Sequence, residues 1–266
     1  MDNALDIKTY AYTDKGGRER NEDYYGYYWE AGAGCWVVAD GLGGHSGGEV
    51  ASRFVTEALI ERSGIWTSFS DDEIIRIVID INDALLASQL SAPENKGMKT
   101  TLAAVFAENG VMKFIHAGDS RLYYFRNNRI IICSKDHSMS QRAVDAGEIR
   151  FEDIRFHEER NIVLKVMGLE NLNLTGMVGT IRPEPGDAFL LCSDGFWEYV
   201  VEDEMISELS KAAEPYEWLM GMLNAHRGKT PANNDNYTAV CSMVSAQLRQ
   251  DGWRRQETGP GCEKVN

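Results

Sequence analysis

The sequence lacks several features that would assign it to other classes of protein. It has no run of about 18 apolar residues, the length of a membrane-spanning helix. Residues 1–6 contain neither the basic nor the apolar stretch of a signal peptide. Its 5 cysteines are scattered without a C-x-x-C pair, and Cys35, Cys133, Cys192 and Cys241 lie in apolar, strand-like runs. We therefore expect buried thiols, no membrane partner and a cytoplasmic protein.

Positive charge and metal-binding clusters of cysteine and histidine are also scarce. There are 27 Lys and Arg against 41 Asp and Glu, which gives a formal net charge of −14. No cluster of Lys and Arg could neutralise a row of phosphates, so we expect no nucleic-acid partner. The absence of a Cys/His cluster argues against zinc. Most of the acidity is expected to keep the surface soluble, and part of it to serve as cation ligands.

What is present indicates one layered domain. The 266 residues, 43% of them hydrophobic, are enough for a sizeable core, and there is no internal repeat or linker. Strands, a helical pair, a β-meander and then strand, helices and strand predict an α/β (α+β) fold with antiparallel sheets. The expected strands are residues 7–13, 24–29, 36–40, 101–107, 111–117, 121–125, 130–133, 188–192 and 237–244. The expected helices begin after residue 48 and at residue 70, and span 138–147, 202–213 and 215–226.

Two segments depart from this regular pattern. Residues 134–182 lose strand character, and an irregular insertion of that size inside a domain is usually functional. The last residues have no apolar periodicity. We therefore expect one domain over residues 1–245 with a flap at about 134–182, followed by a disordered tail over 246–266.

Carboxylates recur where the predicted strands begin or end. An apolar strand delivers Asp40 into a bend that contains five glycines, Asp119 and Asp194 also follow apolar strands, and Glu22/Asp23 and Asp235 each precede one. Carboxylates gathered at strand ends repel one another, and burying them without a cation is costly. Each aspartate could instead cap its own turn, which explains a single Asp-Gly better than it explains five sites together. Oxygen ligands favour Mg²⁺ or Mn²⁺.

Such a cluster suggests phosphoryl chemistry. Two divalent ions that share a carboxylate can also share a hydroxide, which attacks phosphorus in line with the leaving group. Arg18 lies close in sequence to the acidic pair and could bind phosphoryl oxygens through two parallel hydrogen bonds.

An ordered set of motifs resembles a known family. The set resembles the metal-dependent Ser/Thr protein phosphatases of the PPM family, the protein phosphatase 2C class, in their bacterial form. The motifs occur in the family's order over about residues 12–244, and any one of them alone is weak. They are Arg18-x-x-Asn21-Glu22-Asp23, Asp40-Gly41-x-Gly43-Gly44, Gly48-Glu49-Val50-Ala51-Ser52, Thr100-Thr101-Leu102, Gly118-Asp119-Ser120-Arg121, Asp136-His137-Ser138, Ser193-Asp194-Gly195 and Asp235-Asn236.

The resemblance implies a fold, a cofactor and an activity. The fold would be a four-layer αββα sandwich with two central, mainly antiparallel β-sheets flanked by helices. The cofactor would be two Mn²⁺ or Mg²⁺ ions, with a third, weaker ion. The activity would be hydrolysis of phosphoserine and phosphothreonine on proteins, which would reverse a bacterial Ser/Thr kinase. The sequence is silent on oligomeric state, and a monomer is the default expectation.

It also implies roles for individual residues. Asp40 would bridge both ions, and the Gly41 carbonyl would bind one of them. Asp194 and Asp235 would hold the first ion, while Glu22 and Asp23 would complete the second site. Asp119 would help Asp194 to hold the third ion, and Arg18 would bind the substrate phosphate. Asp40, Asp194 and Arg18 are thus the expected catalytic residues.

The sequence departs from the family pattern at a few positions. Many eukaryotic members have a histidine, proposed as a general acid, where this chain has Leu42, so that role does not transfer. His45 lies three residues further on, where a backbone hydrogen bond is the simpler role. Lys99 stands where bacterial relatives often have glycine, and His137 is expected to order the base of the flap.

Two other functions are weighed against the phosphatase. A catalytically silent phosphoprotein-binding module on the same fold would be expected to have lost at least one ligand aspartate, and none is lost. A nucleotide-binding protein could use the glycines of residues 41–48. Neither G-x-x-x-x-G-K-[ST] nor G-x-G-x-x-G fits that segment.

Overall fold

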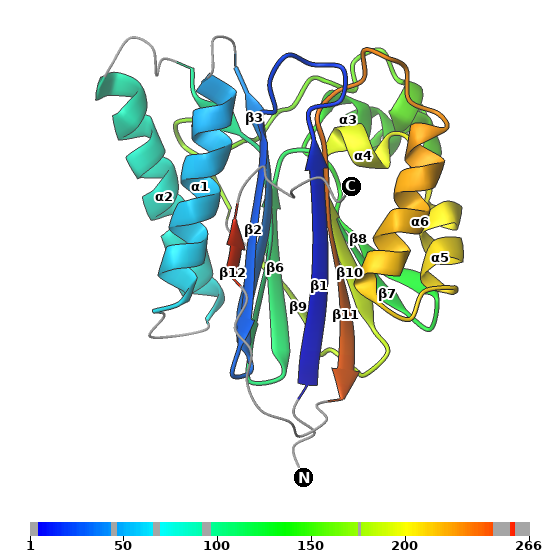
Figure 1. The fold of residues 1–266 in the computed structure, drawn as a ribbon. Helices are drawn as coiled ribbons and strands as arrows, with labels where there is room; N and C mark the ends of the chain where they lie inside the picture. The colour runs from blue at the N-terminus through cyan, green and yellow to red at the C-terminus, as the bar shows by residue number, and fades with distance from the viewer. Residues whose placement is uncertain are drawn as a thin grey trace.

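The chain folds into two β-sheets that lie face to face, with helices on both outer sides (Figure 1). This computed structural model describes residues 5–43, 47–65, 70–91, 97–174, 177–246 and 256–258. One sheet has the strand order β1-β11-β10-β7-β8, and the other has the order β12-β2-β3-β5-β6-β9, with β4 paired to β3. All of these pairings are antiparallel.

The elements follow one another in the order that the sequence predicts. The strands are β1 (Leu5–Asp14), β2 (Asp23–Glu30), β3 (Ala33–Leu42), β4 (Lys99–Thr100), β5 (Leu102–Glu108), β6 (Val111–Ala117), β7 (Arg121–Arg126), β8 (Arg129–Cys133), β9 (Gly179–Ile181), β10 (Ala188–Cys192), β11 (Tyr237–Ala246) and β12 (Gln256–Thr258). The helices are α1 (Gly47–Ser63), α2 (Asp71–Ser91), α3 (Met139–Asp145), the 3₁₀ helix η2 (Phe151–Phe156), α4 (Asp194–Trp197), α5 (Glu202–Leu209) and α6 (Pro215–Arg227).

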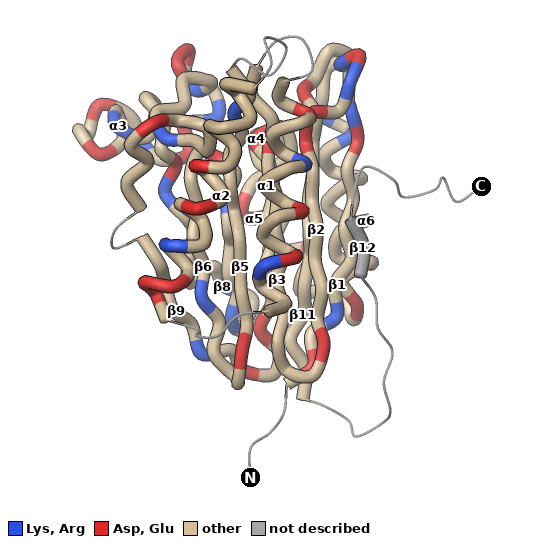
Figure 2. Tube along the Cα trace, turned by 90° about the vertical axis from the view of Figure 1, so that its left-hand side faces the viewer, with Lys and Arg blue, Asp and Glu red and all other residues tan. Residues whose placement is uncertain are grey.

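Strand alternation explains the four layers. Successive side chains of a strand point to opposite faces, so a strand buried on both faces is apolar throughout. In β3, Trp36 and Val38 pack between the two sheets with Phe189, whereas Val37 packs on the other face among residues of α1 and α2. In β10, Leu190 packs against residues of α5 and α6. The predicted αββα sandwich is confirmed, and Figure 2 shows α1 and α2 in front of the β2-β3-β5-β6 sheet.

The structure differs from the sequence-based prediction in its shortest elements. Strands β4 and β9 and the single turn α4 were not predicted, and α5 ends at Leu209 rather than near residue 213. Strand β9 lies inside the segment predicted to lose strand character. Residues 256–258 of the predicted disordered tail pair with β2 as β12, and the rest of the tail lies outside the described residues. Such short elements depend on their neighbours, because they carry too few residues to show a period.

The segment 134–182 contains α3 and η2 and is hydrogen-bonded to the sheets at its base. Ser138 caps α3 by accepting a hydrogen bond from the backbone N–H of Gln141. The Met167 N–H donates to the Thr100 carbonyl at 2.8 Å, and the Thr100 N–H donates back at 3.2 Å. This pair of bonds places the segment beside β3, because β4 pairs with that strand. No described helix combines the length and the apolar character that crossing a membrane would need.

Candidate metal centre

Strand register brings the predicted carboxylates to one end of the sandwich. In the β2–β3 pair, Asp23 lies opposite Asp40. In the other sheet β10 runs between β7 and β11, and Asp194 follows it to begin α4. Asp119 precedes β7 and Asp235 precedes β11, and both of these strands are antiparallel to β10. The carboxylates of Asp40, Asp119, Asp194 and Asp235, each from the end of a different strand, therefore lie at one end of the sandwich, with Asp23 opposite Asp40.

These carboxylates line a cleft of about 510 Å³. Every residue predicted for the site contributes to its wall except Asp23, which is 1% exposed and lies beneath it. The wall comprises Arg18, Glu19, Arg20, Glu22, Asp40, Gly41, Leu42, Gly43, Asp119, Asn161, Val163, Asp194, Asp235 and Asn236.

Asp23 is held by two hydroxyl groups and no basic residue. Its Oδ2 accepts hydrogen bonds from Ser193 Oγ at 2.6 Å and Thr238 Oγ1 at 2.7 Å. Its Oδ1 is buried and has no hydrogen-bond partner among the described residues. Burial raises the pKa of Asp23 to about 7, although the two hydroxyl groups oppose that shift. A buried carboxylate oxygen without a partner is costly, and a cation would satisfy it.

The neighbouring aspartates raise one another's pKa. Burial, and then the charges of Asp23 and Asp194, raise the pKa of Asp40 well above its ordinary value. Burial and the charge of Asp194 do the same to the pKa of Asp119. Burial and the charge of Asp235 raise the pKa of Asp194 to about 6, and its Oδ1 is a second buried oxygen without a described partner. The cluster therefore disfavours its own ionisation unless positive charge enters the cleft.

The glycines of the bend let three backbone segments meet at the cleft. The Gly41 N–H donates to the Glu22 carbonyl at 3.0 Å. A Cβ atom at Gly41 would lie 2.2 Å from the Gly48 carbonyl oxygen, so no larger residue fits there. Burial raises the pKa of Glu22, and the charges of Asp235 and Glu49 raise it further. Its position is fixed by its backbone N–H, which donates to Asn236 Oδ1 at 2.8 Å.

Arg18 supplies positive charge at the rim. One of its terminal nitrogens donates to Asp235 Oδ2 at 2.8 Å. This bond, with the nearby charges of Asp235, Asp194 and Asp40, raises the pKa of Arg18. Its side chain is 57% exposed, so the pair is a surface ion pair that a competing anion can open.

The donor set fits hard divalent cations. The acidic residues of the predicted site offer carboxylate oxygens, and two of these oxygens, one on Asp194 in the cleft wall and one on Asp23 beneath it, are buried without a described partner. Mg²⁺ and Mn²⁺ prefer such ligands, whereas zinc sites are richer in nitrogen and sulfur. No three His, Cys, Asp or Glu residues within the described ranges already form a compact cage.

Sequence reasoning did not assign the residues that hold these ligands. The Asp40 N–H donates to Thr101 Oγ1 at 2.9 Å, and Thr100 Oγ1 donates to the Asp40 carbonyl at 2.9 Å. Both threonines belong to a motif, and a pair of hydroxyl residues beside a strand end is a usable signal. Asn161 and Val163 reach the cleft from the irregular segment, where the sequence offers no period or motif to indicate it.

The departures from the family pattern have different surroundings. Leu42 lines the cleft and pairs with Lys99 in the β3–β4 ladder. His45 lies outside the described residues. The His137 N–H donates to the Gly118 carbonyl at 2.8 Å, and its ring stacks on His116 with the centroids 4.5 Å apart, at the start of the irregular segment. The cysteines Cys35, Cys133, Cys192 and Cys241 are free thiols, all of them buried except the half-buried Cys133.

Comparison with known families agrees with this fold. The family model described as Protein phosphatase 2C matches residues 16–230, which is most of the chain. The chain therefore belongs to the protein phosphatase 2C family, as the motifs predict.

Individual relatives are named as phosphatases. The chain is 33% identical over 236 residues to the serine/threonine protein phosphatase PstP of Mycobacterium tuberculosis, which covers 85% of this chain and 43% of the relative. It thus spans less than half the length of that protein. It is 30% identical over 250 residues to the serine/threonine phosphatase stp of Listeria welshimeri, covering 90% of this chain and 96% of that one. A solved structure of the PstP catalytic domain in complex with two manganese ions has a TM-score of 0.78 at 29% identity, covering 91% of this chain and 99% of that one.

Proposed function

We propose that the protein is a metal-dependent protein phosphatase that hydrolyses phosphoserine and phosphothreonine on proteins. One observation carries the proposal: Asp23, Asp40 and Asp194, whose pKa values are raised, gather in and beneath one cleft. Arg18 is paired to a further carboxylate, that of Asp235, at the rim. Perturbed acids that lack a basic partner mark functional sites. Family membership and the names of the relatives support this reading.

The cleft would hold two Mn²⁺ or Mg²⁺ ions and a third, weaker one. Asp40 would be a ligand of both of the first two ions, and the Gly41 carbonyl would be a ligand of one of them. Asp194 and Asp235 would hold the first ion, Glu22 and Asp23 would complete the second site, and Asp119 would share the third ion with Asp194. Bound there, the ions supply an acidified water and positive charge for the phosphoryl oxygens.

The chain's own residues would orient the substrate. Arg18 would exchange its single bond to Asp235 for two parallel bonds to the phosphate, which fixes the phosphorus over the carboxylates. Thr100 and Thr101 would keep Asp40 from turning when its charge is neutralised, because they bond its backbone on both sides.

Domain limits and partners follow from the same reading. Residues 1–245 would form the phosphatase domain, with a flap at about 134–182 that places Asn161 and Val163 on the cleft wall. The substrates would be phosphoproteins made by a partner Ser/Thr kinase, and the enzyme would act as a monomer. A silent phosphoprotein-binding module is less favoured, because every ligand position keeps its oxygen donor.

The test is hydrolysis of a phosphothreonine peptide by metal-stripped protein, with Mn²⁺, Mg²⁺, Ca²⁺ or Zn²⁺ added back. We expect turnover with Mn²⁺ or Mg²⁺, and none from Asp194→Ala, which should stay folded by circular dichroism. Folded wild-type protein that hydrolyses nothing with any of the four ions would reject the enzyme and favour the binding module.

A further inference from the structure

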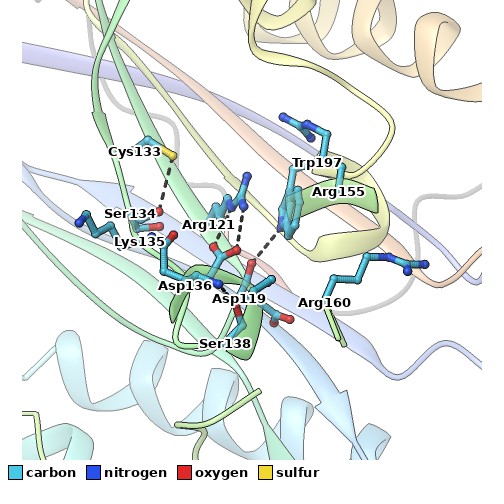
Figure 3. A network of polar contacts seen from close by, with 12 residues as sticks. Asp119, Arg121, Cys133, Ser134, Lys135, Asp136, Ser138, Arg155, Arg160 and Trp197 are labelled. Carbon is cyan, nitrogen blue, oxygen red and sulfur yellow. Dashed lines mark hydrogen bonds and ion pairs between the residues drawn. The ribbon is translucent and has the colours of Figure 1, made fainter. Parts of the chain in front are cut away.

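A buried ion pair connects the base of the flap with the strand that follows Asp119. Arg121 and Asp136 both have side chains that are 1% exposed. The Arg121 Nε and a terminal nitrogen each donate to one Asp136 oxygen at 2.7 Å (Figure 3). Two parallel bonds fix the plane of the guanidinium group as well as its position. Neither residue of the pair lines the cleft.

This guanidinium group lies against the indole of Trp197. The Arg121 Cζ is 3.4 Å from the centre of the indole, and the Cζ of Arg155 is 5.5 Å from it. Arg155, from η2, is itself paired with Glu202 of α5 at 2.5 Å. Trp197 is 2% exposed. Two fixed guanidinium groups and burial therefore hold the ring in one orientation.

In that orientation the indole N–H bonds the backbone of a residue that lines the cleft. Trp197 Nε1 donates to the backbone carbonyl of Asp119 at 2.9 Å, as Figure 3 shows. Asp119 lies between β6 and β7, outside both ladders, and follows Gly118, which has a φ of +112°. The strands alone therefore do not fix its backbone. Trp197 also lies in the same helical turn as Asp194, because the single turn α4 begins with Asp194 and ends with Trp197.

We propose that Trp197 is a positioning residue that keeps Asp119 beside Asp194, so that the two carboxylates can share an ion. This inference rests on the proposed function, because it concerns ions that the phosphatase would bind. Asp119 and Asp194 repel each other while the cleft holds no cation. A neutral bond to the backbone of Asp119 opposes that repulsion without adding charge to the cleft.

The test compares Trp197→Phe with the matched control Trp218→Phe in the whole 266-residue chain. Trp218 is 0% exposed, and its Nε1 donates to the Met205 carbonyl at 3.0 Å. Met205 belongs to α5 and does not line the cleft. Each change removes one indole N–H bond to a carbonyl and some ring volume. Binding of Mn²⁺ to metal-stripped protein is measured by calorimetry, and free Mn²⁺ by its electron paramagnetic resonance signal.

We expect Trp197→Phe to weaken at least one Mn²⁺ binding step by about tenfold, the low end of what the loss of a group supporting a metal ligand costs. Trp218→Phe should leave every step unchanged, although both variants lose thermal stability. Equal Mn²⁺ affinities in Trp197→Phe and wild type would overturn the proposal, as would equal weakening in both variants.

A second substitution covers the case in which Trp197→Phe does not fold. Replacing Trp197 with 3-benzothienylalanine keeps the shape of the ring and removes only the N–H group. The same tenfold loss is expected, and unchanged affinity would overturn the proposal. Wild-type protein that binds no Mn²⁺ would overturn the proposed function and this inference together. Wild-type protein that binds Mn²⁺, with unchanged affinity in the Trp197 variants, would overturn only the role of Trp197.

Discussion

The two ends of strand β10 carry carboxylates in opposite circumstances. Asp187 lies just before the strand and is 2% exposed. Arg126 donates to both of its oxygens, at 2.8 and 2.7 Å, and the Tyr124 hydroxyl and the Glu184 N–H add bonds at 2.7 and 2.8 Å. Asp194 lies just after the strand, with one buried oxygen that has no described partner and with other aspartates around it.

The difference separates a structural charge from a functional one. A buried carboxylate that makes all of its hydrogen bonds contributes little to function, but removing its partner costs stability. A buried carboxylate left without a counter-charge costs stability, and such groups are retained where a ligand supplies the charge. The Asp187 end of the sandwich has its charge paired, whereas the Asp194 end gathers carboxylates for which we propose that cations supply the counter-charge. Each prediction below tests one side of this contrast.

Exchanging each aspartate for asparagine should give opposite phenotypes. Asp194→Asn should lower kcat by about 1,000-fold or more, because it removes an ion ligand and the charge that binds the ion. In the metal-free state it should be as stable as wild type or more so, since the repulsion is reduced. Asp187→Asn should lose about 2–3 kcal/mol of unfolding free energy, because Arg126 is left in a partly buried site with fewer partners.

Both variants are measured by urea denaturation with EDTA and by phosphopeptide hydrolysis with Mn²⁺. The folded fraction of Asp187→Asn should retain wild-type kcat. The contrast fails if Asp187→Asn loses turnover while its stability is unchanged, or if metal-free Asp194→Asn unfolds much more easily than wild type.

The metal-free protein should become less stable as the pH rises through neutrality. The folded-state pKa is about 7 for Asp23 and about 6 for Asp194, against 3.8 ordinarily. Between about pH 4 and pH 7 the folded state therefore binds more protons than the unfolded state, so its unfolding free energy falls as the pH rises. The contribution of these groups is complete below about pH 4 and lost above about pH 7.

We expect wild-type protein with EDTA to lose about 2 kcal/mol between about pH 5.5 and pH 7.5, measured by urea denaturation. The slope should be smaller in Asp194→Asn, and saturating Mn²⁺ should remove it. Stability that is level or rises with pH in the metal-free wild type would contradict the raised pKa values.

The same two aspartates show what the sequence can predict. Asp194 was predicted from an apolar strand followed by Ser-Asp-Gly and from the order of the motifs, because strand ends must meet at a sheet edge. Asp187 follows Pro-Gly and resembles an exposed turn residue, since its partner Arg126 lies 61 positions away. The two hydroxyl groups that donate to Asp23 belong to Ser193 and Thr238, which lie 170 and 215 positions further along the chain. Pairs so far apart leave no local pattern in the sequence. The placement of these acidic residues at strand ends was thus predictable, whereas the groups that hydrogen-bond to them depend on register.

Substitution of Arg18 tests whether this arginine at the rim of the cleft binds the substrate phosphate or neutralises the carboxylates. If it binds phosphate, Arg18→Ala should raise KM for a phosphothreonine peptide by about tenfold and change kcat less. Mn²⁺ affinity should then rise or stay level, because a competing cation has left the cleft. Arg129→Ala, an exposed arginine of β8, is the control and should change neither parameter. A fall in kcat with an unchanged KM would instead assign Arg18 to the chemical step.

Leu42 provides the smallest expected effect. It lines the cleft two residues after Asp40, half-buried in the β3–β4 pair, at the position where a general acid has been proposed in other members of the family. If the ions and carboxylates supply the chemistry, Leu42→His should keep kcat within about twofold and leave the acid limb of its pH profile in place. A histidine that took part would add an ionisation near its ordinary pKa of about 6.5 and raise kcat below it. That result would show that the cleft can use a proton donor, and that the contrast between the two ends of β10 does not by itself account for turnover.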